Sequence, residues 1–178
     1  MSQYPNLTVN SKGHLKFGGC DLIALAGKFG TPLYVMNEDI IRSNAIRYVR
    51  GLKGRYPNSD VVYAGKAFLS GWMCSVIDEE GMLLDVVSGG ELYTAIRAGF
   101  SPGKIVFHGN NKSSEEIAMG INVGVGRFVV DSYHEMEILN KLARKAGKKA
   151  DILLRIAPGI EAHTHEYIRT GQIDSKFG

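Results

Sequence analysis

Short aliphatic and β-branched runs recur at nearly constant spacing along most of this chain. The runs begin at Val61, Leu83, Lys104, Arg127 and Asp151, and successive starts lie 21 to 24 residues apart. Helical patterns fill the intervals. Strands that alternate with helices pair in parallel, because the chain crosses over before each new strand, and right-handed crossovers curl the sheet one way. The sequence therefore predicts an α/β fold built on a parallel sheet.

Helix start signals support this reading. Ser113 with Glu116 and Ser132 with Glu135 each match a capping box, in which two side chains and two backbone amides satisfy each other. An earlier helix is expected from Asp39, whose carboxylate can cap the first amides, to about residues 51–54.

The first 32 residues have a different character. They are rich in glycine and polar residues, show little helical pattern, and contain a hairpin-like run from His14 to Gly19. We expect residues 1–32 to belong to a separate structural part and residues 33–178 to form the repeating one.

The repeat alone fits both a doubly wound sheet and a (β/α) barrel. No GxGxxG motif follows the first predicted strand, and GxxxxGK[ST] is absent from the chain, which weakens the dinucleotide and nucleotide readings. We therefore favour a TIM-type barrel. A complete one has eight strands and about 250 residues, whereas five predicted strands precede residue 178. The expectation is a partial (β/α)8 barrel, in a chain that is a fragment.

Composition excludes several classes of function. The net charge of +3 arises from 21 basic and 18 acidic residues spread along the chain, so nothing indicates nucleic-acid binding. No run approaches the roughly 20 apolar residues that cross a bilayer. Cys20 and Cys74 form no CxxC or metal-binding spacing, and the N-terminus lacks an apolar signal-peptide core. We expect a cytoplasmic protein without a membrane segment.

Lys66 lies near the end of the first predicted strand, which runs from Val61 to Ala67. A lysine there can point into the mouth of a barrel, where a buried primary amine with a lowered pKa is a nucleophile towards an aldehyde. A solvated lysine that closes a strand is the alternative from the residues alone.

The next strand end combines Asp85, Ser88 and Glu91 around two glycines. Taken alone, it is a strand-to-helix turn with a capping serine and an acid in the first helical turn. Asn110 and His108 belong to a polar cluster after the third strand, which alone reads as a capped loop.

Arg155 places a charge in an apolar run and needs an anionic partner. We expect this partner to be Glu91, an anionic oxygen of a cofactor, or an acid in a purely structural ion pair.

His163 and His165 form an HxH pair that could bind a metal from one face of a strand. The pair lies beyond a Pro-Gly break, and no further histidine follows it. We therefore expect no metal.

Several motifs in chain order resemble those of the fold-type III pyridoxal-phosphate decarboxylases, and among them the diaminopimelate decarboxylases. The motifs are Tyr-Ala-x-Lys-Ala at 63–67, Asp-Val-Val-Ser-Gly-Gly-Glu-Leu at 85–92, His-Gly-Asn-Asn-Lys-Ser at 108–113, and Pro-Gly-x5-His-x-Tyr-x-x-Thr-Gly at 158–171 followed by Asp-Ser-Lys-Phe-Gly. The similarity runs from about Gly30 to the last residue, and Gly13 to Leu15 is also similar to the N-terminal strand of the family.

The resemblance implies a barrel of the alanine racemase-like kind that binds pyridoxal 5'-phosphate, and an N-terminal segment that packs with a C-terminal β-domain. It implies that Lys66 is the catalytic lysine and holds the cofactor covalently. The further residues that it implies for cofactor binding are Asp85, Glu91, His108, Asn110 and Arg155, and His165 is implied to line the active site or bind substrate.

For a full-length enzyme, the resemblance implies a homodimeric lyase that decarboxylates meso-2,6-diaminopimelate to L-lysine and CO2, the last step of lysine biosynthesis. The phosphate loop, the substrate-binding arginines and the catalytic cysteine of the family lie beyond this chain. The chain alone is therefore expected to be inactive.

Three other functions stay open at this point. Ornithine or arginine-type decarboxylases share the lysine motif but match the motifs at 108–113 and 158–171 less well. A non-catalytic pyridoxal-phosphate-binding barrel would not need the β-like segment at residues 1–32. A metal-dependent barrel hydrolase would use His163 and His165 as zinc ligands.

Overall fold

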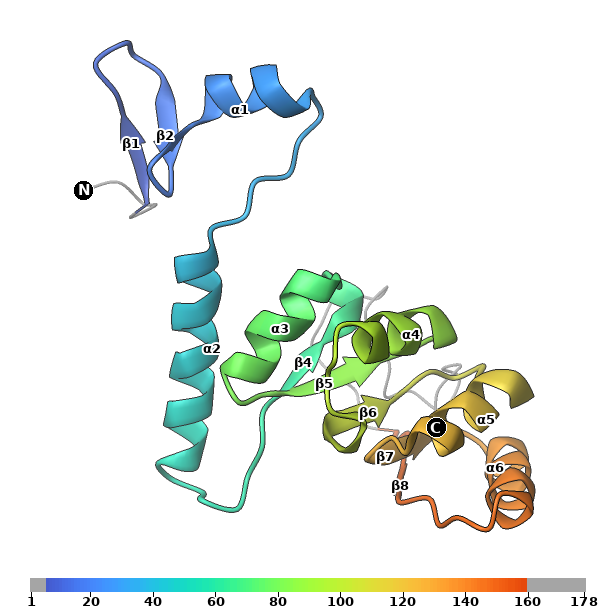
Figure 1. The fold of residues 1–178 in the computed structure, drawn as a ribbon. Coiled ribbons are helices and arrows are strands. Elements are labelled where there is room, and N and C mark those ends of the chain that lie inside the picture. Colours follow the sequence, from blue (N-terminus) through green and yellow to red (C-terminus); the bar gives the residue numbers. More distant parts are fainter. Residues whose placement is uncertain (1–5, 160–178) are drawn as a thin grey trace. The chain divides into compact units, whose positions relative to one another are not determined.

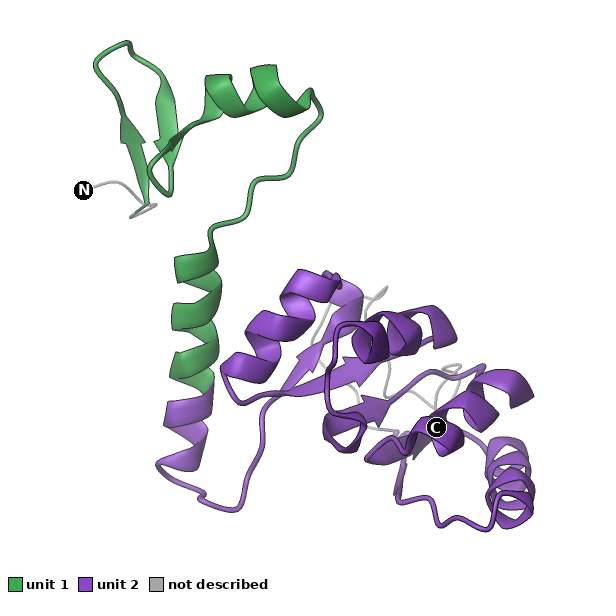
Figure 2. Ribbon diagram, viewed as in Figure 1, with its two compact units in different colours: residues 1–48 green, residues 49–178 purple. Residues whose placement is uncertain are grey.

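The computed structural model describes residues 6–159 of the chain (Figure 1). The chain divides into two compact units, residues 1–48 and 49–178 (Figure 2). The boundary falls inside a helix. The assignment of residues 1–32 to a β-domain of a longer protein stays a prediction.

A small antiparallel sheet forms the first part of the N-terminal unit. Strands β1 (Leu7–Val9), β2 (Leu15–Phe17) and β3 (Cys20–Asp21) pair in that order. Gly18 and Gly19 join β2 to β3 with φ angles of 56° and 81°, the left-handed conformation that a two-residue hairpin turn of this kind requires. The hairpin predicted in this region is confirmed.

Helix α1 (Leu22–Phe29) follows directly. The expectation that residues 1–32 contain little helix was therefore wrong. Asp21 begins the helix, because its carboxylate accepts hydrogen bonds from the amides of Ile23 and Ala24. An N-capping acid before an apolar run was the signal available in the sequence.

Helix α2 (Glu38–Lys53) ends where the sequence predicted. Its first amides are capped by a different residue, since the Asn37 side chain, not that of Asp39, accepts a hydrogen bond from the Ile40 amide at 3.1 Å. Asp39 instead lies in the first turn, where a negative charge interacts favourably with the helix dipole.

A five-stranded parallel sheet forms the base of the second unit, and its strands pair in chain order. All five predicted strands are confirmed, and each begins within one residue of the expected start. The strands are β4 (Val62–Ala64), β5 (Leu83–Val86), β6 (Ile105–Phe107), β7 (Arg127–Val130) and β8 (Ile152–Leu154).

The first of these strands is shorter than the run from Val61 to Ala67 suggested. β4 ends at Ala64, and a single 3-10 turn, η1 (Gly65–Ala67), carries Lys66. The apolar run thus contains a strand and the turn that leaves it.

The helices of this unit lie along one face of the sheet. Consecutive helices contact each other, and Figure 1 shows α3 to α6 following one another along the sheet. A doubly wound sheet would carry helices on both faces. The arrangement is therefore that of a partial (β/α) barrel, as predicted. The helices are α3 (Gly71–Glu79), α4 (Gly89–Arg97), α5 (Ser114–Val123) and α6 (Tyr133–Lys145), with a 3-10 turn η2 (Pro102–Lys104) before β6.

Alternation along the strands separates the core from the inner face of the sheet. Leu84 and Val86 are 0% exposed beneath the helices. Leu83 and Asp85, between them in the sequence, line a cavity of about 730 Å³ on the opposite face. One strand thus supplies both apolar packing and a charged group for the inner face.

Gly126 offers a test of this packing. A Cβ added there would overlap the carbonyl oxygen of Gly103, which is backbone and cannot rotate away. We expect Gly126→Ala to lower the free energy of unfolding by about 1–3 kcal/mol, measured by urea unfolding. Gly103→Ala is the matched control, since its added Cβ meets no atom within 4 Å. Equal effects of the two substitutions would contradict the close approach.

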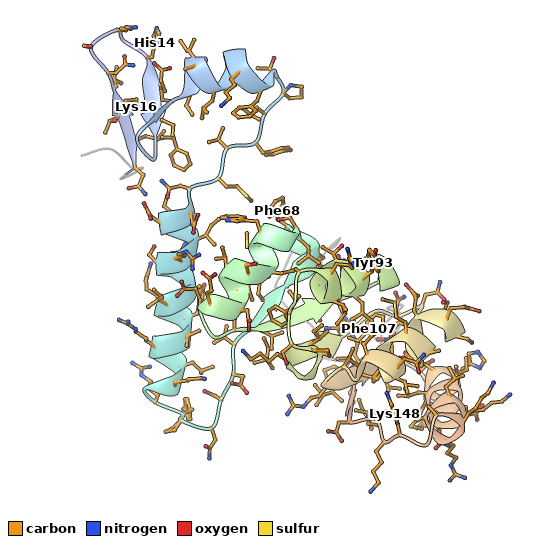
Figure 3. The ribbon with its side chains drawn as sticks, viewed as in Figure 1. His14, Lys16, Phe68, Tyr93, Phe107 and Lys148 are labelled. Atoms are coloured by element: carbon orange, nitrogen blue, oxygen red, sulfur yellow. The ribbon has the colours of Figure 1, made fainter. Side chains whose placement is uncertain are left out.

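Asp21 provides a pH test for the N-terminal unit. Its carboxylate accepts a hydrogen bond from Asn10 and lies 2.9 Å from Nδ1 of His14, a residue that is labelled in Figure 3. The hydrogen bond with His14, together with the bonds from the Ala24 and Ile23 amides, lowers the pKa of Asp21 from 3.8 to about 2. The ionised Asp21 carboxylate therefore stabilises the folded N-terminal unit fully above about pH 4, and this contribution is lost as the pH falls through about 2.

We expect the exchange protection of the Ile23 and Ala24 amides to be lost with a midpoint near pH 2, and Asp21→Asn to remove this pH dependence. The measurement is hydrogen exchange followed by NMR. A midpoint near 3.8, the ordinary pKa of the group, would refute the link with His14.

Candidate active site

The polar residues identified in the sequence gather at the carboxyl ends of the strands. Parallel strands bring these ends to one edge of the sheet, the edge at which (β/α) barrels carry their sites. Asp85 lies in β5, and His108 and Arg155 directly follow β6 and β8. Lys66 lies two residues beyond the end of β4.

Lys66 is exposed at this edge. Among residues 6–159, no group forms a hydrogen bond or an ion pair with its ammonium. The expectation of a buried amine was therefore wrong for this structure. An exposed and unpaired amine is nevertheless accessible to a carbonyl compound.

The turn that carries Lys66 is bridged by Tyr63. Its hydroxyl donates a hydrogen bond of 2.9 Å to the carbonyl oxygen of Phe68, which is labelled in Figure 3. Burial raises the pKa of the Tyr63 hydroxyl, so the group keeps its proton. The bridge spans η1 and holds both of its ends.

Asp85 and His108 form a pair between neighbouring strands. The Asp85 Oδ1 atom lies 2.6 Å from His108 Nδ1, and the Asp85 side chain is 14% exposed. The His108 amide also donates to the carbonyl oxygen of Val86 at 2.8 Å. A carboxylate that accepts from Nδ1 orients the imidazole and leaves Nε2 on its other side.

The inner face of the sheet places this pair beside Arg155. Asp85, His108 and Arg155 all line the cavity of about 730 Å³, whereas Lys66 is not among its lining residues. The structure therefore brings three of the predicted site residues around one cavity, with Lys66 at the strand end next to β5.

Glu91 lies in the first turn of α4, and its carboxylate turns back towards the strand. Its Oε2 atom accepts a hydrogen bond of 2.6 Å from the Val87 amide, while the Ser88 hydroxyl accepts from the Glu91 amide. The carboxylate thus stabilises the turn after β5. Any contact of Glu91 with a cofactor stays a prediction.

Arg155 is paired with Asp131. Its Nε atom lies 3.5 Å from Asp131 Oδ1, and the Asp131 side chain is 6% exposed. The structural acid was one of the three partners expected for Arg155. A cofactor contact by Arg155 stays a prediction.

Glutamates in the first turns of α5 and α6, like Glu91 in α4, accept hydrogen bonds from backbone amides that precede the helix. Glu116 accepts hydrogen bonds from the amides of Ser113 at 2.9 Å and Gly89 at 2.6 Å, so the predicted capping box at Ser113 is confirmed. At Ser132 only half of the box forms. The Ser132 hydroxyl accepts from the Glu135 amide, but the Glu135 carboxylate accepts from the preceding Asp131 amide.

Lys112 was missed as a residue of interest in the sequence. It immediately precedes the capping Ser113, and its side chain is 0% exposed. A cation is unfavourable at a helix N-terminus because of the helix dipole. A lysine at that position was the available signal that something other than solvent must hold it.

The structure says less about the two remaining predicted site residues, Asn110 and His165. Asn110 is exposed in the loop after β6. His165, and with it the HxH partner His163, lies outside the described residues. Their predicted roles stay predictions.

Neither a metal cluster nor a membrane helix is seen in the described part of the chain. Residues 6–159 contain no group of three His, Cys, Asp or Glu side chains arranged to hold a metal ion. Within the same range, the helices are too short or too polar to span a bilayer.

The chain is similar in sequence to several proteins of one named enzyme. The chain is 52% identical over 174 residues to the diaminopimelate decarboxylase of Bacillus methanolicus, and 51% identical over 169 residues to that of Bacillus subtilis (strain 168). These matches cover 96% and 95% of this chain but 39% and 38% of the relatives. The chain therefore spans about two fifths of the length of these relatives.

A solved structure shows the same fold. Diaminopimelate decarboxylase from M. jannaschii, in co-complex with L-lysine, superposes with a TM-score of 0.85 at 37% identity, covering 100% of this chain and 42% of the other. The partial barrel described above therefore occurs as part of a longer protein.

The sequence model described as "Pyridoxal-dependent decarboxylase, pyridoxal binding domain" matches residues 42–178, which is well over half of the chain. The strand edge with Lys66, Asp85, His108 and Arg155 lies within that match. The chain thus belongs to the pyridoxal-dependent decarboxylases, and residues 42–178 are part of their pyridoxal binding domain.

Proposed function

We propose that this chain is the N-terminal part of a diaminopimelate decarboxylase, which converts meso-2,6-diaminopimelate to L-lysine and CO2. The single observation that carries the proposal is Lys66, an exposed amine without a partner among residues 6–159, at the carboxyl end of a barrel strand. The identities of 52% and 51% to named diaminopimelate decarboxylases support the choice of substrate.

The residues at this edge fit pyridoxal phosphate. The cofactor carries an aldehyde, an aromatic ring and anionic oxygens. Lys66 offers an accessible amine, and the imidazole of His108 offers a flat surface and a polar atom beside the cavity of about 730 Å³. Arg155 offers a partly exposed guanidinium to an anionic oxygen. When bound, this cofactor serves as the sink for the electron pair that a departing carboxyl group leaves behind.

Each residue then has a distinct part. The Lys66 amine would hold the cofactor covalently through its aldehyde carbon. Asp85 fixes the orientation of the His108 ring through Nδ1 at 2.6 Å. Arg155, held by Asp131, keeps a positive charge at the cavity. Asn110 contacts the cofactor from the loop after β6, His165 lines the active site or binds substrate, and Glu91 holds the loop that borders the cofactor.

The compartment, the oligomeric state and the role of the N-terminal segment are proposed from the likeness to the family. The full-length enzyme is a cytoplasmic homodimer that acts on a small amino acid, and residues 1–32 pack with its β-domain. The co-complex of the M. jannaschii enzyme with L-lysine, the product of the proposed reaction, supports an amino-acid ligand. The five parallel strands among residues 6–159 do not by themselves close a barrel, so we expect the 178-residue chain alone to be inactive.

Borohydride trapping tests the role of Lys66. We expect the full-length protein, incubated with pyridoxal phosphate and reduced, to carry the pyridoxyl label selectively on the peptide that contains Lys66. Peptide mass analysis locates the label, and Lys66→Ala should abolish it together with lysine formation. Lys149→Ala is the control for an exposed lysine on another part of the fold and should change neither.

Two results would contradict the proposal at different levels. Label spread over surface lysines of the full-length protein would refute the cofactor site. Selective label on Lys66 without release of CO2 from meso-diaminopimelate would keep the cofactor class and refute the substrate.

Tyr63→Phe tests whether the bridge across η1 holds Lys66 in position. The substitution removes one hydrogen bond to the Phe68 carbonyl, which costs about 0.5–1.5 kcal/mol of stability. We expect the rate of label formation at Lys66 to fall several-fold while the protein stays folded. Tyr93→Phe, on the exposed surface of α4, is the matched control. An unchanged rate in Tyr63→Phe would show that the bridge does not position the lysine.

A further inference from the structure

Lys112 is a buried cation for which the proposed chemistry has no use. It lies between β6 and α5, its side chain is 0% exposed, and its Nζ atom lies 5.8 Å from the centre of the Phe107 ring. A charge taken out of water is costly unless it is paired and hydrogen-bonded. The position therefore requires a specific set of partners.

Three oxygens surround the ammonium. Lys112 donates to the carbonyl oxygen of Gly109 at 2.6 Å and to that of Val129 at 2.9 Å, and its Nζ atom lies 2.8 Å from Glu135 Oε1. The two carbonyl contacts are hydrogen bonds, whereas the contact with Glu135 Oε1 is an ion pair without hydrogen-bond geometry. The Lys112 ammonium is thus held by two hydrogen bonds and one ion pair within the protein, in contrast to that of Lys66.

The first partner connects Lys112 to the candidate site. Gly109 follows His108 directly and has a φ angle of 110°, in a backbone region that favours glycine. A Cβ at Gly109 would lie 3.0 Å from the carbonyl oxygen of Val87, so this loop passes close to the turn after β5. The bond from Lys112 to the Gly109 carbonyl therefore fixes the backbone beside the imidazole that pairs with Asp85.

Glu135 connects Lys112 to the pair formed by Asp131 and Arg155. The second carboxylate oxygen of Glu135 accepts a hydrogen bond from the Asp131 amide at 3.1 Å. Asp131 in turn pairs with Arg155. The ammonium thus lies between the loop that carries His108 and the turn that carries the partner of Arg155.

Stability alone is a weak reason for such an arrangement. Buried ion pairs can often be replaced by apolar groups of similar volume without loss of stability, whereas removal of one partner leaves an uncompensated charge. The value of the charge lies in the geometry that it imposes on its neighbours.

We propose that Lys112 is a positioning residue of the cofactor site. Its buried ammonium sets the orientation of the His108 imidazole and of the Asp131–Arg155 pair, and it does not itself contact cofactor or substrate. This inference rests on the proposed function, because the site that it positions is the one proposed for pyridoxal phosphate.

Two variants of the full-length protein separate positioning from stability. Lys112→Met removes the ammonium but leaves the charge of Glu135 buried. Lys112→Met combined with Glu135→Gln removes both charges and keeps an oxygen that can accept from the Asp131 amide. We expect the single variant to unfold at lower temperature and the double variant to recover most of the loss.

The decisive measurements are the affinity for pyridoxal phosphate, followed by its absorbance, and the ring nitrogen NMR signals of His108 in protein freed of cofactor. We expect the double variant to bind the cofactor about tenfold more weakly than the wild type or worse, with shifted His108 signals, despite its recovered stability. Glu135→Gln alone, which keeps the ammonium and its two carbonyl partners, should show the smallest shift of the His108 signals.

The inference is overturned if the double variant regains both the cofactor affinity, within twofold, and the wild-type His108 signals. If Lys112→Met alone does not fold, the cofactor affinity and the His108 signals of the double variant are sufficient to test the inference. If the wild-type protein does not bind pyridoxal phosphate, the proposed function fails, but the His108 signals still report whether Lys112 orients the ring.

Discussion

Parallel pairing of β4 to β8 is the constraint on which the rest of the structure depends. The registers place Ala64 opposite Asp85, and Val86 opposite Phe107, so that the residues which follow β4, β5 and β6 emerge side by side. Because the helices between β4 and β8 lie along one face, the other face can carry Asp85 and His108 around a cavity. A slip of one residue would turn these side chains into the helix layer.

The same edge is stabilised by a repeated backbone contact. In α4, α5 and α6, a glutamate of the first turn accepts a hydrogen bond from an amide of the preceding loop, and Glu116 also reaches the neighbouring turn at Gly89. These contacts satisfy amides that the parallel ladder and the helices leave unpaired. Rigid turns at the strand ends are what a site with several contributing strands needs.

The strands, the type of sheet and the partial barrel could be predicted, because local periodicity encodes them. Side-chain partners could not, since they depend on which residues the register brings together. Arg155 pairs with Asp131, which lies two dozen residues away on the adjacent turn. The predicted cap at Asp39 was wrong for a simpler reason: Asn37, two residues earlier and directly before the first helical residue, provides an equally good acceptor. Helix α1 was missed because glycine-rich flanks masked the signal at Asp21.

Two lysines at the same edge of the sheet show why composition and motif cannot assign chemistry by themselves. Both follow a barrel strand, yet Lys66 is exposed without a partner among the described residues, while Lys112 is surrounded by three oxygens. A nucleophile must be reachable, whereas the Lys112 ammonium is buried and lies 2.8 Å from a carboxylate oxygen of Glu135. Under the proposed function, the exposed lysine carries the chemistry and the enclosed one holds the loops around it.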